Sequence, residues 1–338
     1  MTQDTSKTGG SGAREPSVYH ARACELHAQH PVVDAHCDTI TLVLDDGLDF
    51  VGGDPRSQVD LPRLRAGGVS LQVLACWNEA AHSGHAAFAR CMAKIGAFHR
   101  LARQHGLRHV KGVADLDGPG VGFVLSMEDA APCMGSGPHL EALYAAGVRM
   151  IGLTWNGRNE LADGVGVGLR PGGLTDVGRE LVTQMAELGI VVDLAHVSKP
   201  SFWDVFEVVS GPVAVSHANA AAVQAHRRNL DDDQIRAVAE RSGVIGVTFV
   251  PSFLADGGTA SVRDVVRHVN HLVATGGAGV VGLGSDFDGI TVPPDGLNDV
   301  GDLPGLTAAL LAEGHSEADV VGFLGGNWLR VFRAVWHG

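Results

Sequence analysis

Eight short apolar runs, each rich in β-branched residues and each followed by a more polar stretch, recur along the chain. They cover residues 31–36, 69–77, 121–128, 147–155, 189–196, 211–217, 243–250 and 279–286. Continuous apolar runs of this length are typical of parallel strands buried on both faces. Eight such strands alternating with helices predict an α/β fold, a single-domain (β/α)₈ TIM-type barrel.

The segments between these runs carry the three- and four-residue spacing of helices. The pattern predicts helices over residues 85–104, 140–146, 231–241 and 262–274, short helices from 304 to 335, and a buried stripe formed by Leu174, Val177, Leu181, Met185 and Leu188. An open doubly wound sheet is the alternative, but it would need a GxGxxG turn after the first strand. That strand instead ends in HCDT, which favours the barrel.

Composition sets the expected domain limits and surroundings of the chain. Residues 1–17 are polar and rich in Gly and Ser, and we interpret them as a disordered tail before one barrel domain over 18–338. The start lacks the apolar segment of a secretory signal, and no apolar run reaches the length of a membrane span. Five irregularly spaced cysteines do not suggest a disulfide framework. We therefore expect a cytoplasmic protein without membrane attachment.

A net charge of −13 without a concentrated basic segment argues against nucleic acid as a partner. A small-molecule substrate is the partner we expect instead.

Polar residues end most of the predicted strands, and a barrel brings such strand ends together at one mouth. Three imidazoles and three carboxylates meet this description: His36, Asp38, Glu128, His196, His217 and Asp286. This mixture of ligands suits Zn²⁺, with Mn²⁺ or Co²⁺ as alternatives. We expect Asp34 and Asp193 to support these residues from outside the site, and Asp288 to hold a turn.

Six ligands are more than one zinc ion needs, so the count favours two ions joined by a bridging carboxylate. A modified lysine bridges the metals in some barrel hydrolases, but none of the four lysines here ends a strand. Glu128 is therefore the expected bridge. Two ions would lower the pKa of a shared water enough to form hydroxide at neutral pH.

Eight motifs in order over residues 31–335 resemble the membrane (renal) dipeptidases, the M19 metallopeptidases of the amidohydrolase superfamily. They are VDAHCDT, SMEDA, GLTWNGRNELADG, VDLAHVS, PVAVSHANA, HRRNLDDDQI, GLGSDFDG and GNWLRVF. The resemblance implies two zinc ions per chain. His36 and Asp38 would hold one ion, His196 and His217 the other, and Glu128 both. It also implies that Asp286 is the catalytic acid/base and that Arg228 binds the terminal carboxylate of the substrate.

One position departs from the family pattern. Many of these dipeptidases have a histidine after the fourth strand that polarises the scissile carbonyl, whereas this chain has Trp155. Trp155 or Asn156 is then the expected hydrogen-bond donor to the oxyanion. The resemblance implies hydrolysis of dipeptides, including those with a C-terminal D-residue, and suggests a homodimer.

Two other functions stay open at this point. Trp155 also fits a metal-dependent amidase or lactonase that acts on a non-peptide metabolite. A non-catalytic metal-binding protein is the third hypothesis, although the complete set of ligands and the acid/base argue against it.

Overall fold

A parallel β-barrel forms the centre of the computed structural model, which describes residues 18–337. Neighbouring strands pair in the ring order β1, β2, β4, β5, β6, β7, β8, β9, and β9 pairs again with β1. The bounds are β1 Val33–Cys37, β2 Leu71–Trp77, β4 Gly122–Glu128, β5 Val148–Gly152, β6 Val191–Asp193, β7 Ala214–Val215, β8 Val244–Val247 and β9 Val281–Leu283. Each lies within one of the eight apolar runs or overlaps it, so the predicted (β/α)₈ barrel is confirmed. The expected tail over residues 1–17 lies outside the described residues.

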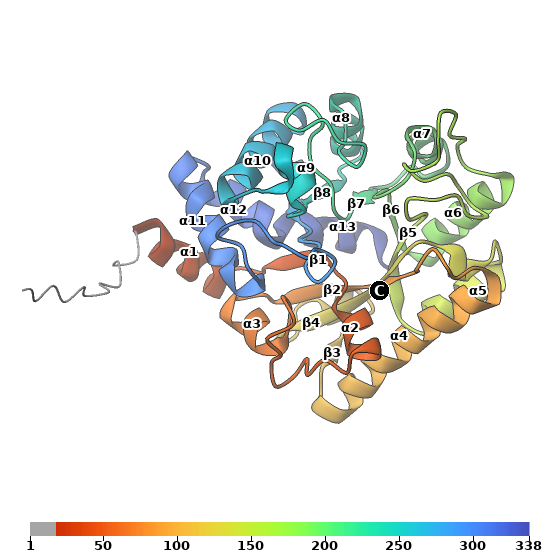
Figure 1. The fold of residues 1–338 in the computed structure, drawn as a ribbon, viewed down its shortest axis with the longest axis horizontal. Coiled ribbons are helices and arrows are strands. Elements are labelled where there is room, and N and C mark those ends of the chain that lie inside the picture. The colour runs from red at the N-terminus through yellow and green to blue at the C-terminus, as the bar shows by residue number, and fades with distance from the viewer. Residues whose placement is uncertain (1–17, 338) are drawn as a thin grey trace, which may run out of the picture.

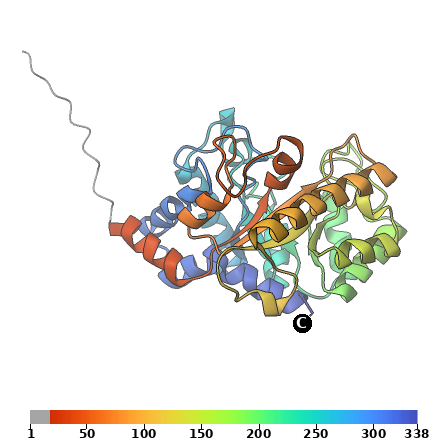
Figure 2. The same ribbon diagram turned by 90° about the horizontal axis from the view of Figure 1, so that it is seen from below.

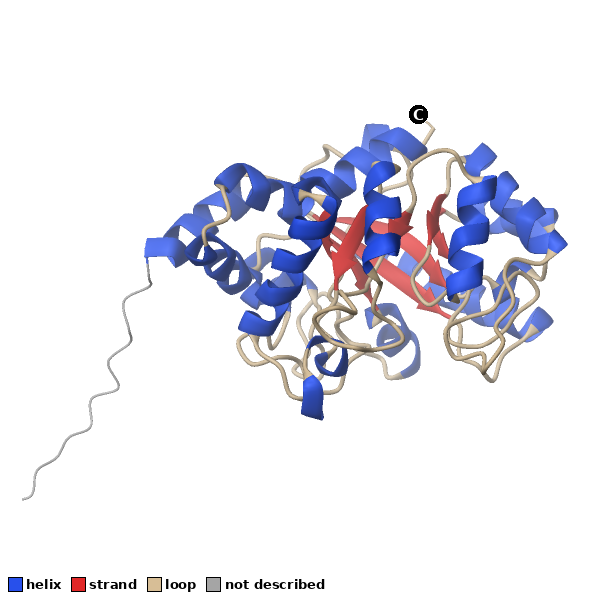
Figure 3. Ribbon diagram, turned by 90° about the horizontal axis from the view of Figure 1, so that it is seen from above, coloured by secondary structure: helices blue, strands red, loops and turns tan. Residues whose placement is uncertain are grey.

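Helices surround the barrel, as Figures 1 and 3 show, and the long helix α4 runs along one side of the molecule in Figure 2. Their bounds are α1 Val18–Gln29, α2 Thr39–Asp45, α3 Leu61–Ala66, α4 Gly84–His105, α5 Gly137–Ala145, α6 Asp176–Leu188, α7 Lys199–Val208, α8 Asp232–Glu240, α9 Pro251–Leu254, α10 Val262–Gly276, α11 Leu303–Glu313, α12 Glu317–Val321 and α13 Asn327–Val335. All the predicted helices occur. The sequence analysis missed α1, α2, α3, α7 and α9.

Two further details differ from the prediction. A ninth strand, β3 (Arg108–His109), pairs with the first residues of β4, and its two residues are too few to show a periodicity. In α6 the expected buried stripe fails at Val177, which is 39% exposed. The buried residue at this point of α6 is Gly178, which packs against the backbone of Leu161, where a side chain would collide.

The N-terminal half of the barrel is filled by apolar side chains. Most strands contribute at least one of them, for example Val33, Val124 and Val191, and α13 packs Trp328 and Phe332 against the same cluster. The indole of Trp328 donates a hydrogen bond to the carbonyl of Leu283 in β9. Because this end is filled, the barrel is open to ligands at the C-terminal ends of its strands.

Disulfides and membrane-spanning helices are both absent from residues 18–337. All five cysteines are free thiols. No helix within residues 18–337 combines the length and apolar character needed to cross a membrane.

Candidate metal centre

The predicted site residues come from five strands or from the turns that follow them. His36 lies within β1 and Glu128 is the last residue of β4. His196, His217 and Asp286 lie two or three residues beyond β6, β7 and β9, so the predicted strands were too long at these ends. At His196 and Asp286 the backbone has φ values of 67° and 64°, and this left-handed conformation cannot continue a strand.

One oxygen of Glu128 faces two imidazoles. Its Oε1 is 2.8 Å from Nε2 of His196 and 3.7 Å from Nε2 of His217. The two Nε2 atoms are themselves 2.9 Å apart. All three side chains are buried.

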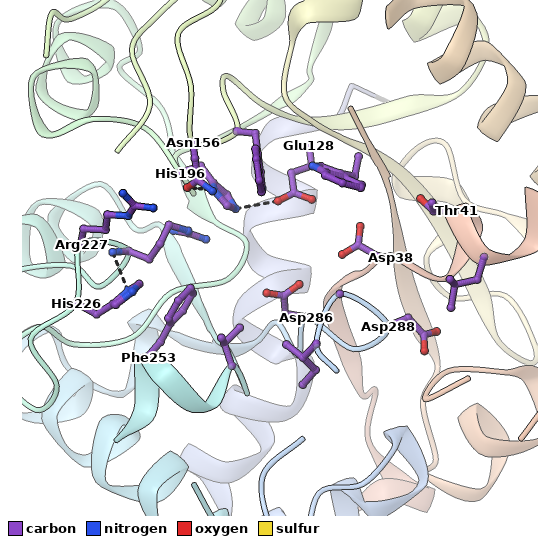
Figure 4. A pocket seen from close by; sticks show the side chains of 17 residues that line it. Asp38, Thr41, Glu128, Asn156, His196, His226, Arg227, Phe253, Asp286 and Asp288 are labelled. Carbon is purple, nitrogen blue, oxygen red and sulfur yellow. Dashed lines mark hydrogen bonds and ion pairs between the residues drawn. The ribbon is translucent and has the colours of Figure 1, made fainter. Parts of the chain in front are cut away.

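The other oxygen of Glu128 faces a second group of ligand atoms. Its Oε2 is 3.4 Å from Nε2 of His36. The same nitrogen lies 3.9 Å from Oδ2 of Asp38 and 3.8 Å from Oδ1 of Asp286. Figure 4 shows the carboxylates of Glu128, Asp38 and Asp286 around one space. Glu128 therefore stands between two groups of ligand atoms, one with each oxygen.

Buried polar atoms without a hydrogen-bond partner indicate whether these residues suit a metal ion. Nε2 of His36 and Oδ1 of Asp38 are buried and have no hydrogen-bond partner in the described part of the chain. Buried polar atoms are normally satisfied, so these two need a partner that the chain does not supply. Ligand atoms of His36, Glu128 and His217 lie within 4.8 Å of one another, as do those of His36, Asp38 and Asp286. The donor set fits divalent metal ions.

The side chains that face Oε1 of Glu128 and those that face Oε2 differ in charge. Burial lowers the pKa of His196 to about 4, and burial with nearby positive charge lowers the pKa of His217 well below its usual value. Both imidazoles are thus neutral at pH 7, which is the form that binds metals. Burial opposes ionisation of Glu128, but the imidazoles of His36 and His196 lower its pKa well below the usual range.

The group around His36 is rich in negative charge. Burial would lower the pKa of His36, yet Glu128, Asp38 and Asp286 raise it to about 10. Burial raises the pKa of Asp286 to about 7 and, with Glu128 beside it, raises the pKa of Asp38 well above its usual value. These shifts show that three close carboxylates favour a positive charge at this position.

Hydrogen bonds orient the two imidazoles that face Oε1. With Nε2 free for a metal, Nδ1–H of His196 donates to Oδ1 of Asn156 at 3.1 Å, and Nδ1–H of His217 donates to Ser216 Oγ at 2.8 Å. Asp193 accepts bonds from the backbone N–H groups of Ala195 and Ser216, next to both imidazoles.

Asp34 and Asp288, which we predicted not to bind the metal, also fix nearby segments of the backbone. Asp34 accepts hydrogen bonds from the N–H and Oγ of Ser285, the residue before Asp286. Asp288 accepts from Thr39 Oγ1, Ser57 Oγ and the N–H of Gln58, and it ties these segments together.

A cavity of about 550 Å³ lies over the site, and the predicted substrate-binding residues Trp155, Asn156 and Arg228 line it. Arg228 is not on a surface helix, as its sequence surroundings alone would suggest. It is 4% exposed, lies in the segment between β7 and α8, and donates to the carbonyl of His217 at 2.9 Å. Burial lowers its pKa to about 10, so the guanidinium stays charged at pH 7.

The sequence did not point to several residues that line this cavity, among them Trp77, Arg227 and Phe253. Trp77 ends β2, and its ring lies 5.6 Å from that of Trp155 in an edge-to-face contact. Its position at a strand end was a usable signal, but an apolar side chain there does not stand out from the strand itself. Arg227 adjoins Arg228 in the sequence. Nothing in the sequence indicates Phe253.

Comparisons with known proteins identify the family to which the chain belongs. A family model described as "Membrane dipeptidase (Peptidase family M19)" matches residues 20–337. A Klebsiella pneumoniae protein named "Uncharacterized protein in pqqA 5'region" is 41% identical over 224 residues, 63% of this chain and 82% of that protein. The dipeptidase aclJ of Aspergillus oryzae is 34% identical over 297 residues, 83% of this chain and 70% of that protein.

A solved structure is similar over nearly the whole chain. It is a metallopeptidase from Rhodobacter sphaeroides, liganded with a phosphinate mimic of the dipeptide L-Ala-D-Ala. Its TM-score is 0.85 at 28% identity, with 91% of this chain and 99% of that chain covered. The closed barrel, with imidazoles and carboxylates gathered at its mouth, places the protein in the class of metallo-hydrolases. Within that class, the chain belongs to the membrane dipeptidase family, peptidase family M19.

Proposed function

We propose that the protein is a dipeptidase that uses two zinc ions. The observation that carries the proposal is the position of Glu128, whose Oε1 faces His196 and His217 and whose Oε2 faces His36. His36 and Asp38 would hold one ion, His196 and His217 the other, and Glu128 both. When bound, the ions would acidify a shared water and polarise the scissile carbonyl.

The chain's own residues account for the remaining steps. Asp286 lies beside His36 and lines the cavity, where it accepts a proton from the attacking water and delivers it to the leaving amine. Arg228 binds the terminal carboxylate of the substrate, and its planar guanidinium suits that task. Since Arg228 and several of the metal-site residues line one cavity, a substrate held by its carboxylate would present a nearby amide bond to them.

Asn156 is the better donor to the oxyanion in this proposal. Its Oδ1 accepts from His196, which directs its amide N–H groups away from that bond, and the residue lines the cavity. The indole of Trp155 packs against Trp77 and forms an apolar wall beside it. One donor of this kind contributes about 3–4 kcal/mol to lowering a barrier.

A panel of dipeptides tests the function. Zinc-reconstituted protein and chelator-stripped protein are compared on L-Xaa-L-Xaa and L-Xaa-D-Xaa substrates. We expect zinc-dependent hydrolysis of both series. Acceptance of a C-terminal D-residue is proposed because the Rhodobacter sphaeroides relative binds a mimic of L-Ala-D-Ala. Inert dipeptides with about two zinc ions bound per chain would contradict the substrate class and leave the metal site standing.

Trp155 supports one alternative, an amidase or lactonase that acts on a non-peptide metabolite. The indole occupies the cavity wall at the position where the family pattern has a polar donor. The same panel, extended to simple amides and lactones, distinguishes the two functions. The alternative predicts turnover of an amide or lactone and none of any dipeptide.

A further inference from the structure

Two adjacent arginines lie at one end of the cavity without an acidic partner. Neither Arg227 nor Arg228 forms an ion pair with any carboxylate in the described part of the chain. The guanidinium of Arg228 makes one hydrogen bond, to the carbonyl of His217, and its buried Nε has no partner in the described residues. Arg227 is exposed and lines the same cavity. Figure 4 shows Arg227 and His226 on the side of His196, opposite Thr41 and Asp288.

A second cavity of about 230 Å³ adjoins this end. It shares His196, Arg227 and Arg228 with the cavity over the metal ligands. Its other charged residues are Lys199 and Asp231, which pair with each other at 2.5 Å. Asp231 also accepts from the N–H of Gln234 at the start of α8, so its carboxylate is already engaged. In the described residues neither guanidinium thus has a carboxylate within ion-pairing distance, and the carboxylates of Asp286, Glu128 and Asp193 act on Arg228 only from further away.

Two guanidiniums that line the cavity without an ion-pair partner favour a ligand with two negative charges. A simple dipeptide carries one carboxylate at its C-terminal end, which the proposed function assigns to buried Arg228. Arg227 lies at the boundary between the two cavities, where it can reach a group on the C-terminal side chain of the substrate. Guanidinium–carboxylate hydrogen bonds are strong and directional, and partial burial weakens their screening by water.

We propose that the preferred substrates are dipeptides whose C-terminal residue carries a second carboxylate, Asp or Glu. Arg228 binds the α-carboxylate, and Arg227 binds the side-chain carboxylate at the entrance to the second cavity. This inference rests on the proposed dipeptidase function and narrows its substrate class.

Matched substrates test the inference on the zinc-reconstituted full chain. Ala-Asp is compared with Ala-Asn, which has nearly the same shape without the charge, with the C-terminal residue in the L and in the D configuration. We expect kcat/KM for the Asp substrate to exceed that for the Asn substrate by at least about tenfold in the preferred configuration, mainly through KM. Cleavage of both at equal rates would overturn the inference and leave the dipeptidase function intact. No cleavage of any dipeptide would overturn both.

Variants of Arg227 test whether this residue causes the preference for a C-terminal Asp over Asn. We expect Arg227→Gln to bring the Asp-to-Asn ratio close to one, and Arg227→Lys to retain part of the preference because it keeps the charge. Arg263→Gln is the matched control, since Arg263 is exposed on α10 and lines neither cavity. It should leave the ratio unchanged. A ratio that stays high in Arg227→Gln would overturn the assignment to Arg227.

Discussion

His196 and Asp286 show how single residues shape the centre. Both have left-handed backbone conformations, which cost non-glycine residues about 1 kcal/mol or more unless neighbouring contacts hold them. Those contacts are present: the carbonyl of His196 accepts from the N–H of Val165, and the N–H of Asp286 donates to the carbonyl of His36. The turn after each strand thus aims a side chain at the ligands of its neighbours.

Asp286→Asn tests the acid/base role at this scale. The amide has the same shape but cannot accept the proton of the water, so we expect kcat to fall by about 10²- to 10⁴-fold. The zinc content, measured by elemental analysis, should be retained. Asp295→Asn, an exposed carboxylate in the following loop, is the control. Full turnover by Asp286→Asn would show that another group moves the proton.

Asn156→Ala tests a positioning role that is separate from turnover. The change removes the acceptor for Nδ1–H of His196, so the imidazole loses its fixed orientation. We expect the dissociation constant of the more weakly bound zinc ion to rise by about 10- to 100-fold, measured by competition with a chelating dye. Asn298→Ala, at an exposed site far along the chain, should leave it unchanged. Equal zinc affinity in wild type and Asn156→Ala would refute this role.

At the scale of elements, helix α10 is joined to the metal-site side of the barrel by His268. Its Nδ1 accepts from the N–H of Ala220, three residues after His217, and its Nε2–H donates to the carbonyl of Leu254 in α9. The bond from Ala220 requires the neutral imidazole, because a protonated Nδ1 cannot accept a hydrogen bond. Burial lowers the pKa of His268 to about 4.

This shift predicts a loss of stability in acid. The unfolded chain protonates His268 below pH 6.5, whereas the folded chain does so only near pH 4. The free energy of unfolding therefore decreases as the pH is lowered from about 6.5 to about 4. Between pH 7 and pH 5 we expect this imidazole to account for about 2 kcal/mol, measured by urea denaturation. His268→Gln should lose less stability over that interval than wild type. His85→Gln, exposed on α4, should match wild type. Parallel curves for all three proteins would contradict the prediction.

At the scale of the whole molecule, the metal ligands connect strands from around the ring. β1, β4, β6, β7 and β9, or the turns that follow them, each supply at least one of the proposed ligands or the proposed acid/base. Several of these carboxylates and imidazoles are buried close together, and without a cation they repel or stay unpartnered. A metal bound at this centre would therefore stabilise the folded state relative to the unfolded state.

Removal of metal should then lower the melting temperature. We expect a decrease of at least about 5 °C after chelation, measured by calorimetry, and recovery when zinc is added back. The double variant His196→Gln/His217→Gln, which lacks one group of ligands, should show a smaller response to zinc. An unchanged melting temperature in the stripped wild type would show that the centre does not hold metal tightly.

The barrel and the polar residues at its strand ends followed from local patterns in the sequence, whereas Arg228, Trp155 and Asn156 were predicted from the family resemblance. Parallel strands bury both faces, so each strand appears as an apolar run, and a polar residue such as Glu128 at its end stands out. β3 and α9 were missed because two- and four-residue elements carry no periodicity. Phe253 was missed because an apolar residue on a short helix looks the same whether it packs in a core or lines a cavity.

The sequence by itself determined the fold class and the chemical types of the ligands, because both depend on short-range patterns of apolar and polar residues. Only the tertiary structure decided how those ligands are divided between the two oxygens of Glu128, and that Arg228 is buried while Arg227 faces a second cavity. These features depend on distances between residues far apart in the chain, which arise only when the ring of strands closes.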